Sequence, residues 1–355
     1  MNQLKLYRLP FLLLGVLSLV VGVFSGLGRL GWGVSVSTDF HGPWMVCGFL
    51  GVVISLERAV ATAKAWAYLS PLFFGLGSLF IFLTGSFYGS LPFMGIGSVV
   101  LLVMLILFYM KEPQPHNLVL VLGVAALALS ILHFGLDPQR PISKGVADWM
   151  LFLMLTIVGE RVELSRLVKK PPYADRVLIL LLFLAFALNR YPQFLGLVFV
   201  FISIWLYKYD LAFRTWKLGG ITRFVATCLI GGYFWLTICG VLMAIYGIPS
   251  AGPIYDAVLH SMFLGFVFSM IYGHAPMIFP AILGIRIPFM NAFYVHFGLL
   301  QVSLLFRVMA DLLNHPQLRM WTSMVNAISL LLFFAVTIFS AYSGSRKTLS
   351  IKNRT

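Results

Sequence analysis

The sequence has few charged residues and very few acidic ones. Charged side chains make up 10% of the 355 residues and only 11 residues are Asp or Glu, whereas 60% are hydrophobic. Soluble globular domains carry roughly 25% charged residues, so this composition excludes a soluble enzyme or binding domain. The apolar runs are continuous and do not alternate with polar residues, which also excludes a membrane β-barrel.

Cysteine is scarce as well. The three cysteines, Cys47, Cys228 and Cys239, all lie within apolar runs. No CxxC pair or zinc-ligand spacing is present, so neither a disulfide framework nor a zinc domain is expected. A c-type haem attachment motif and a soluble redox domain are also lacking. If the protein carries out redox chemistry, its electrons would therefore come from quinol or from a redox partner protein.

Long apolar segments, by contrast, are abundant. Runs of roughly 20 residues can cross the ~30 Å hydrocarbon core of a bilayer as helices, and in lipid the backbone must satisfy its own hydrogen bonds. We therefore predict an all-α, polytopic membrane helix bundle in which residues 1–355 form a single integral membrane domain. The twelve predicted spans are residues 10–28, 41–60, 66–84, 91–110, 118–135, 146–164, 177–190, 194–212, 223–246, 255–279, 290–312 and 320–342.

The distribution of positive charge predicts the orientation of these spans. The net charge is +14, but the Lys and Arg residues lie mostly in short loops. This pattern is typical of residues that set membrane topology, so the expected partner is the lipid bilayer and not nucleic acid. If the N-terminus is cytoplasmic, 19 of the 25 Lys and Arg residues fall in cytoplasmic segments. Both termini are therefore predicted to be cytoplasmic.

Three predicted spans that run in the same direction share part of a pattern. Spans 41–60 and 146–164 both contain Phe-Leu-x-x-x-Ile-x-x-Glu-Arg, and span 255–279 contains the Phe-Leu of that pattern. Chance similarity in a sequence rich in Phe and Leu is one explanation. The alternative is three four-helix units, centred on these spans, in a pseudo-threefold arrangement.

Five histidines lie inside predicted spans or at their rims, namely His41, His133, His260, His274 and His296. An imidazole in lipid is costly, so it needs a hydrogen bond, a metal, a haem or a proton path. Because a helix rises ~1.5 Å per residue, the predicted topology places the first three toward the outer side. The last two lie toward the cytoplasm.

Some neighbours of these histidines suit a metal or haem site. Asp256 precedes His260 by one helical turn and can reach its ring, and Met45 follows His41 by one turn. Imidazoles near a thioether suit copper or haem iron, and a carboxylate commonly orients such an imidazole. We therefore take His41, His260, His133 and Met45 as candidate metal ligands. Hydrogen-bonded packing is the alternative for each histidine, and His133 also fits a position at the membrane interface.

The span that carries His260 and His274 has an unusual sequence. In a continuous helix, the 14 residues between the two histidines would place both on nearly the same face. Pro276 follows His274 by two residues and predicts a kink or break, which membrane proteins tolerate where the backbone lines a cavity. This span is therefore expected to line a path.

Two acid–base pairs, Glu57-Arg58 and Glu160-Arg161, lie near the inner ends of their spans. Local ion pairing at the membrane interface is one interpretation. The other is that the glutamates line an inner vestibule or proton path and that the arginines bind haem propionates.

The segment His41-Gly42-Pro43-x-Met45-x-x-Gly48-Phe49 resembles the second span of NnrS-family proteins. The segment His260-Ser261-x-x-x-Gly265, followed by Gly273-His274, is similar to a late segment of that family. The resemblance covers the twelve-span topology, with specific motifs in two spans. It implies a haem- and copper-containing protein of the bacterial inner membrane, linked to nitric oxide metabolism or resistance. Gly42-Pro43 replace the extra His and acid of the family's first motif, so the chain would be a divergent member.

The predicted architecture also resembles the catalytic subunit of haem–copper oxidases, in which twelve spans form three four-helix arcs. The adjacent His-His pair that binds copper there is missing here, as is the late His-x-His. Oxygen reduction is therefore not expected.

These observations leave three functions open. In the first, haem b lies between the second and tenth spans with His41 and His260 as axial ligands, while His274 and His296 form a second site and copper is a candidate cofactor. The protein would then act in redox metabolism of nitrogen oxides or in stress resistance. In the second, a secondary transporter uses the embedded histidines to couple protons or metals. The third is a structural subunit with packing histidines.

Overall fold

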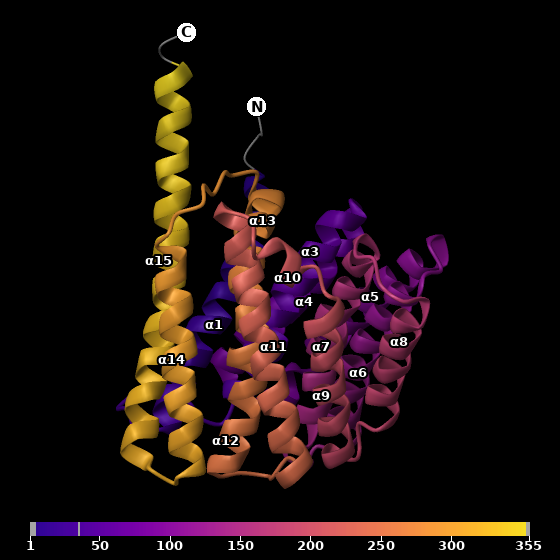
Figure 1. Ribbon diagram of the computed structural model, residues 1–355. Coiled ribbons are helices and arrows are strands. Elements are labelled where there is room, and N and C mark those ends of the chain that lie inside the picture. Colours follow the sequence, from indigo (N-terminus) through magenta and orange to yellow (C-terminus); the bar gives the residue numbers. More distant parts are fainter. Residues whose placement is uncertain (1–4, 35, 353–355) are drawn as a thin grey trace. The chain divides into compact units, whose positions relative to one another are not determined.

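The computed structural model describes residues 5–34 and 36–352, with side chains described to residue 344 (Figure 1). The secondary structure of this part of the chain is entirely helical, so the predicted all-α class is confirmed. Eleven helices among the described residues are long and apolar enough to cross a membrane. Residues 1–4 and 353–355, which hold the two termini of the predicted topology, lie outside the described residues.

The chain divides into two compact units. The N-terminal unit is Tyr7–Glu163, and the C-terminal unit is Met1–Leu6 together with Leu164–Thr355.

The helices of the N-terminal unit follow one another closely along the chain. They are α1 (Leu9–Arg29), α2 (His41–Pro43), the π-helix η2 (Trp44–Leu50), α3 (Gly51–Thr62), α4 (Leu69–Thr84), α5 (Phe87–Lys111), α6 (Pro115–Leu136) and α7 (Val146–Leu164), with short 3₁₀ turns η1 (Leu6–Arg8), η3 (Ala65–Tyr68) and η4 (Ile142–Gly145). Helix α1 packs on α2, η2, α3 and α4, while α5 packs between α4 and α6.

Glycines let α1 approach the second span closely. A Cβ atom at Gly22 would lie 2.7 Å from the Met45 sulfur, and one at Gly26 would lie 2.8 Å from the His41 ring. Small residues at helix contacts are the usual means of close packing in membranes, where lipid gives no hydrophobic drive between helices. The glycines of α1 therefore set the positions of His41 and Met45.

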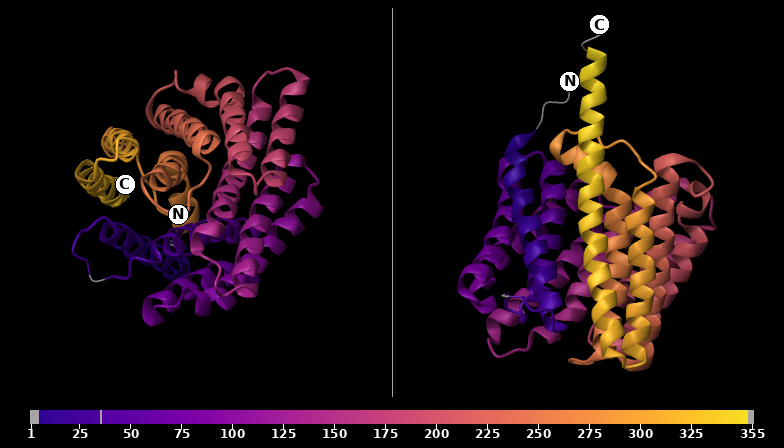
Figure 2. Two further views of the ribbon diagram at one scale, coloured as in Figure 1. Left: turned by 90° about the horizontal axis from the view of Figure 1, so that it is seen from below. Right: turned by 90° about the vertical axis from the view of Figure 1, so that its left-hand side faces the viewer.

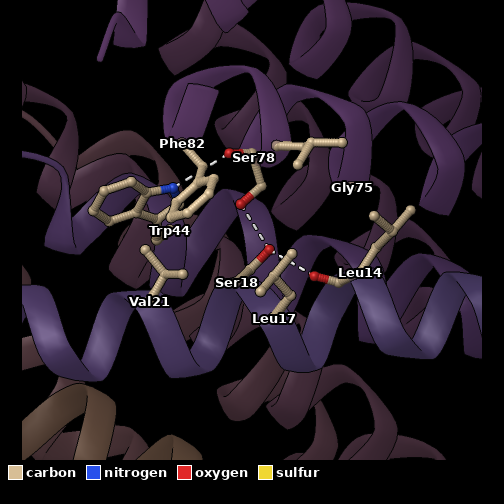
Figure 3. A pocket seen from close by; sticks show the side chains of 9 residues that line it. Leu14, Leu17, Ser18, Val21, Trp44, Gly75, Ser78 and Phe82 are labelled. Atoms are coloured by element: carbon tan, nitrogen blue, oxygen red, sulfur yellow. Dashed lines mark hydrogen bonds between the residues drawn. The ribbon is translucent and has the colours of Figure 1, made fainter. Parts of the chain in front are cut away.

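A small hollow lies where α1, η2 and α4 meet (Figure 3). The Ser18 hydroxyl donates to the Leu14 carbonyl (2.8 Å) and lies 2.6 Å from the Ser78 hydroxyl. The Trp44 indole N–H donates to the Ser78 carbonyl at 3.3 Å. The polar groups in this hollow thus bond to one another and fasten three helices together.

The C-terminal unit contains longer helices. They are η5 (Ser165–Leu167), α8 (Pro172–Ala187), α9 (Pro192–Tyr209), α10 (Ala212–Thr215), α11 (Gly220–Tyr246), α12 (Pro253–His260), the π-helix η6 (Ser261–Phe268), α13 (Ser269–Leu283), α14 (Phe293–Leu312) and α15 (Pro316–Lys352). Helices α14 and α15 run side by side (Figures 1 and 2). Helices α9 and α11 meet at Gly196 and Gly240, where a Cβ on either glycine would fall within 2.7 Å of the other backbone.

Three elements differ from the predicted spans. Helix α8, which corresponds to predicted span 177–190, has 16 residues and is shorter than each of the eleven long apolar spans, several of which join consecutive elements, as His41–Thr62 joins α2, η2 and α3. Helix α15 continues to Lys352, ten residues past the predicted end at 342. Of the kink or break predicted at Pro276, the break is wrong, because α13 runs through Pro276 and Pro280 to Leu283. A proline removes one backbone donor, and a membrane helix tolerates that loss when its neighbours satisfy the freed carbonyl.

Candidate functional site

The helical spans that begin at His41 and at Pro253 each contain a π-helical segment. The segments are Trp44–Leu50 and Ser261–Phe268, and each follows closely after a candidate ligand, His41 or His260. The π-helix accounts for well under 1% of residues in proteins and is frequent at functional sites. The sequence reasoning missed both segments, although both include the shared Phe-Leu of the repeat pattern.

The π-helical segment changes the relation between His260 and His274. The prediction that they share a face assumed α-helical phase along all 14 residues. The i→i+5 bonds of η6 widen its turns, so the phase at α12 does not carry through to α13. The continuous α-helix that this prediction assumed is therefore absent between His260 and His274.

His41 sits at the start of its span against α1. Its Nδ1–H donates to the Gly22 carbonyl at 2.7 Å, which leaves the lone pair of the ring on Nε2. A metal-bound histidine usually donates its other ring nitrogen to a carbonyl or carboxylate in this way. Met45 packs on the same glycine through its sulfur. His41 and Met45 thus share one neighbour on α1, Gly22.

A network of charged side chains surrounds His260. The His260 Nδ1–H donates to the Asp256 carbonyl (2.9 Å) and lies 3.1 Å from the Asp256 carboxylate, so the contact expected from the sequence is present. Arg307 from α14 binds the same carboxylate through Nε (3.0 Å) and Nη2 (2.9 Å). Arg307 Nη2 also donates to His260 Nε2 at 3.2 Å. Both ring nitrogens of His260 are therefore engaged inside the protein.

Further polar residues extend this network toward α15. Arg307 Nη1 lies 3.4 Å from the Asn326 carbonyl oxygen, and the Asn326 amide donates to the Ser303 hydroxyl at 2.6 Å. Asp311, one turn after Arg307, has a fully buried side chain 3.5 Å from Arg319 Nη1. We use "charged network" below for Asp256, His260, Arg307, Asp311 and Arg319. The sequence reasoning missed Arg307 and Asp311, although charged residues inside an apolar span are themselves a signal of function.

The two histidines predicted for the inner side have different surroundings. His274 donates its Nδ1–H to the Met270 carbonyl at 2.7 Å, which again leaves the lone pair on Nε2. His296 is completely buried, and neither of its ring nitrogens has a hydrogen-bond partner among the described residues. Aromatic rings surround it: the Tyr272 ring lies 4.6 Å away between centroids, and three more lie at 5.4 to 6.2 Å, namely Phe333, Phe293 and Phe224.

The sequence matches one family model over residues 8–342, and that model is described as a domain of unknown function, DUF8744. The chain belongs to the DUF8744 family. A search of curated proteins found no match. The DUF8744 match includes both π-helical segments, all five embedded histidines and the charged network. These features therefore belong to the DUF8744 region itself.

The Glu-Arg pairs of this DUF8744 protein come together in the N-terminal unit. Arg58 on α3 forms an ion pair with Glu160 on α7, and Glu57 lies within electrostatic reach of both. Arg161 is buried, with 6% of its surface exposed. The two matching motifs of the repeat pattern thus meet through Arg58 and Glu160, which fits the ion-pairing interpretation of these residues.

His133 lies in the last turn of α6 and is half-buried, near the end that was predicted to reach the interface. No group of three His, Cys, Asp or Glu side chains that could hold a metal gathers among the described residues. The described residues therefore form no closed copper site built from three such side chains. A haem needs only one or two protein ligands, so a haem site does not require such a group.

Proposed function

We propose that this protein binds haem b in the bacterial inner membrane and acts in the redox metabolism of nitric oxide or in resistance to it. Copper is a candidate second cofactor. The resemblance of two spans to NnrS-family proteins supports this proposal, as does the presence of a π-helical segment in each of those spans. Bound haem would supply an iron that exchanges electrons and binds nitric oxide.

The geometry of His41 carries the proposal. Its hydrogen bond to the Gly22 carbonyl fixes the ring and the tautomer, with Nε2 as the ligand nitrogen. Gly26 lacks a side chain where the ring packs, so the imidazole keeps this orientation without a clash. Met45 adds a thioether one turn away. These features together are those of a ligand held in place before its cofactor binds.

The other candidate residues differ in how directly they could bind a cofactor. His274 has the same tautomer as His41 and is the second candidate ligand. His260 would have to release Arg307 before its Nε2 could bind iron or copper. Arg58 and Arg161 are candidates for the haem propionates, and Glu57 and Glu160 for a proton path. Electrons would come from quinol or a redox partner, with both termini on the cytoplasmic side.

Purified full-length protein from haem-replete cells is expected to show a Soret band. His41→Ala should remove most of that absorbance, because the residue proposed to hold the haem iron is lost, while the charged network is untouched. His315→Ala is the matched control, since His315 lies in the loop before α15 and accepts a backbone N–H from Leu318. The measurement is the absorption spectrum with haem and copper analysis of each preparation. Colourless wild-type protein, or an unchanged spectrum in His41→Ala, would contradict the assignment.

The charged network favours a second candidate function, a secondary transporter coupled to protons or metals. Buried Asp, Arg and His side chains inside membrane helices commonly mark ion and proton pathways. Here the Arg307 side chain is 7% exposed and lies between a carboxylate and an imidazole, with hydrogen bonds to both. Asp256 and His260 could exchange a proton across their 3.1 Å contact on α12, while Arg307 from α14 stays protonated and holds the carboxylate.

The transporter function predicts flux in proteoliposomes that carry no haem. His260→Gln should reduce a pH-gradient-driven flux at least tenfold, because Gln cannot exchange a proton, while leaving the fold intact. His315→Gln is expected to have no effect. If the flux of every ion and metal tested equals that of empty liposomes, the transporter function is contradicted. The haem proposal is unaffected by that result.

A further inference from the structure

At one end of the C-terminal unit, exposed cations gather on two loops and on the helix ends beside them. One loop precedes α8, and the other joins α9 to α11 through α10 (Figure 1). We call this surface the basic shelf, and its exposed members are Lys169, Arg176, Lys208, Arg214, Lys217 and Arg223.

Hydrogen bonds hold the parts of the basic shelf together. Arg214 Nη2 donates to the Lys169 carbonyl at 3.3 Å, which joins the two loops. The Trp205 indole donates to the Ala174 carbonyl at 2.7 Å, which joins the end of α9 to the start of α8. The cations therefore lie on one continuous surface, although more than 50 residues separate Lys169 from Arg223 in the sequence.

The loop after α10 is ordered by its own hydrogen bonds. Arg223 Nε donates to the carbonyls of Leu218 (2.7 Å) and Trp216 (3.2 Å). These bonds fix the residues on either side of Lys217 before any ligand arrives, so less conformational entropy is lost on binding.

The acidic side chains of these loops are engaged and do not neutralise the basic shelf. Asp175 pairs with Lys170 at 2.5 Å, and that lysine also lies over the Trp205 ring. Asp210 is 3% exposed and accepts the Ala212 N–H at 2.8 Å. The exposed charge of the basic shelf is therefore strongly positive.

Large apolar side chains project among these cations. Leu167 is 71% exposed, Tyr173 59%, Leu218 54% and Trp216 52%. Aromatic residues mixed with Lys and Arg are typical of the level where lipid headgroups meet hydrocarbon. The apolar side chains suit acyl chains and the cations suit phosphate, so the surface fits an anionic lipid better than a dissolved anion.

We propose that the basic shelf is a binding site for anionic phospholipid headgroups. The phosphate lies among Lys169, Arg214 and Lys217, and Trp216 and Leu218 enter the acyl-chain region. Each Lys or Arg near a lipid surface contributes about fivefold in affinity. Three of them therefore favour phosphatidylglycerol over phosphatidylcholine by well over tenfold. This site does not depend on the haem or transporter function.

The test is native mass spectrometry of the full-length protein in detergent with phosphatidylglycerol or phosphatidylcholine added. We expect a preference for phosphatidylglycerol that falls at least tenfold in the triple variant Lys169→Gln/Arg214→Gln/Lys217→Gln. The control variant, Lys64→Gln/Lys111→Gln/Lys144→Gln, removes three exposed lysines of the N-terminal unit and should keep the preference. Thermal unfolding in detergent without lipid shows whether each variant is folded.

Three results would overturn the proposal. They are equal binding of the two lipids, a preference that survives in the folded triple variant, and full displacement of the lipid by millimolar inorganic phosphate. The last result would show that the basic shelf binds a dissolved anion and not a lipid.

Discussion

Arg307→Met is expected to lower the free energy of unfolding by about 3 kcal/mol or more. The substitution leaves the Asp256 carboxylate without its bidentate partner in a site where that side chain is 22% exposed. Removing one member of a buried ion pair costs about 3–5 kcal/mol, because the remaining charge stays desolvated. His260 Nε2 loses its donor as well. The measurement is unfolding of the purified protein by SDS in mixed micelles.

A double variant separates the ion pair from the shape of the site. Arg307→Met/Asp256→Leu removes both charges, and replacing a buried pair by apolar residues of similar volume is often neutral or stabilising. It should therefore recover most of the lost stability, since the His260 bond to the residue 256 carbonyl remains possible. Arg29→Met, at an exposed arginine, should stay within about 0.5 kcal/mol of wild type. A loss as large in the double variant would show that the loss in Arg307→Met does not come from the unpaired Asp256 carboxylate.

The local contacts of this network could be predicted from the sequence, and the distant ones could not. Asp256 reaches His260 because residues four apart on a helix are neighbours, and that holds whatever the helix packs against. Arg307 lies 51 residues from Asp256, and reaching it depends on which helices pair. Membrane helices are apolar on all sides, so their sequences do not reveal which face meets which neighbour. The shared motif drew attention to Arg58 and Glu160, but their pairing with each other was not predicted.

The π-helical segments could not be predicted from the sequence. The predicted spans were placed well because a bilayer imposes length and apolar composition on each helix. A switch from i→i+4 to i→i+5 bonding has no such requirement, and Trp44–Leu50 and Ser261–Phe268 are as apolar as their surroundings. One of the segments packs closely on α11 at Gly265, where a Cβ would lie 2.3 Å from the Trp235 ring.

His296→Phe is expected to raise the free energy of unfolding by about 1–3 kcal/mol. Both ring nitrogens of His296 are buried without a hydrogen-bond partner among the described residues, and each such polar group costs about 1–3 kcal/mol. Phenylalanine brings no polar atom and suits a site already surrounded by Tyr272, Phe333, Phe293 and Phe224. Its larger ring offsets part of the gain. The same unfolding titration in SDS measures the change.

His260→Phe is the matched comparison and should be destabilising, because that ring is hydrogen-bonded on both sides. The sign of the change in the free energy of unfolding of His296→Phe then distinguishes a functional role of His296 from a structural one. A His296→Phe protein that is more stable than wild type, but has lost the haem spectrum or the flux, would show that His296 is kept for function at a cost in stability. Such a trade is expected where a buried polar group has no structural partner. A less stable His296→Phe protein would mean that the imidazole is hydrogen-bonded in the native membrane protein, and the interpretation of its two ring nitrogens as unsatisfied would be wrong.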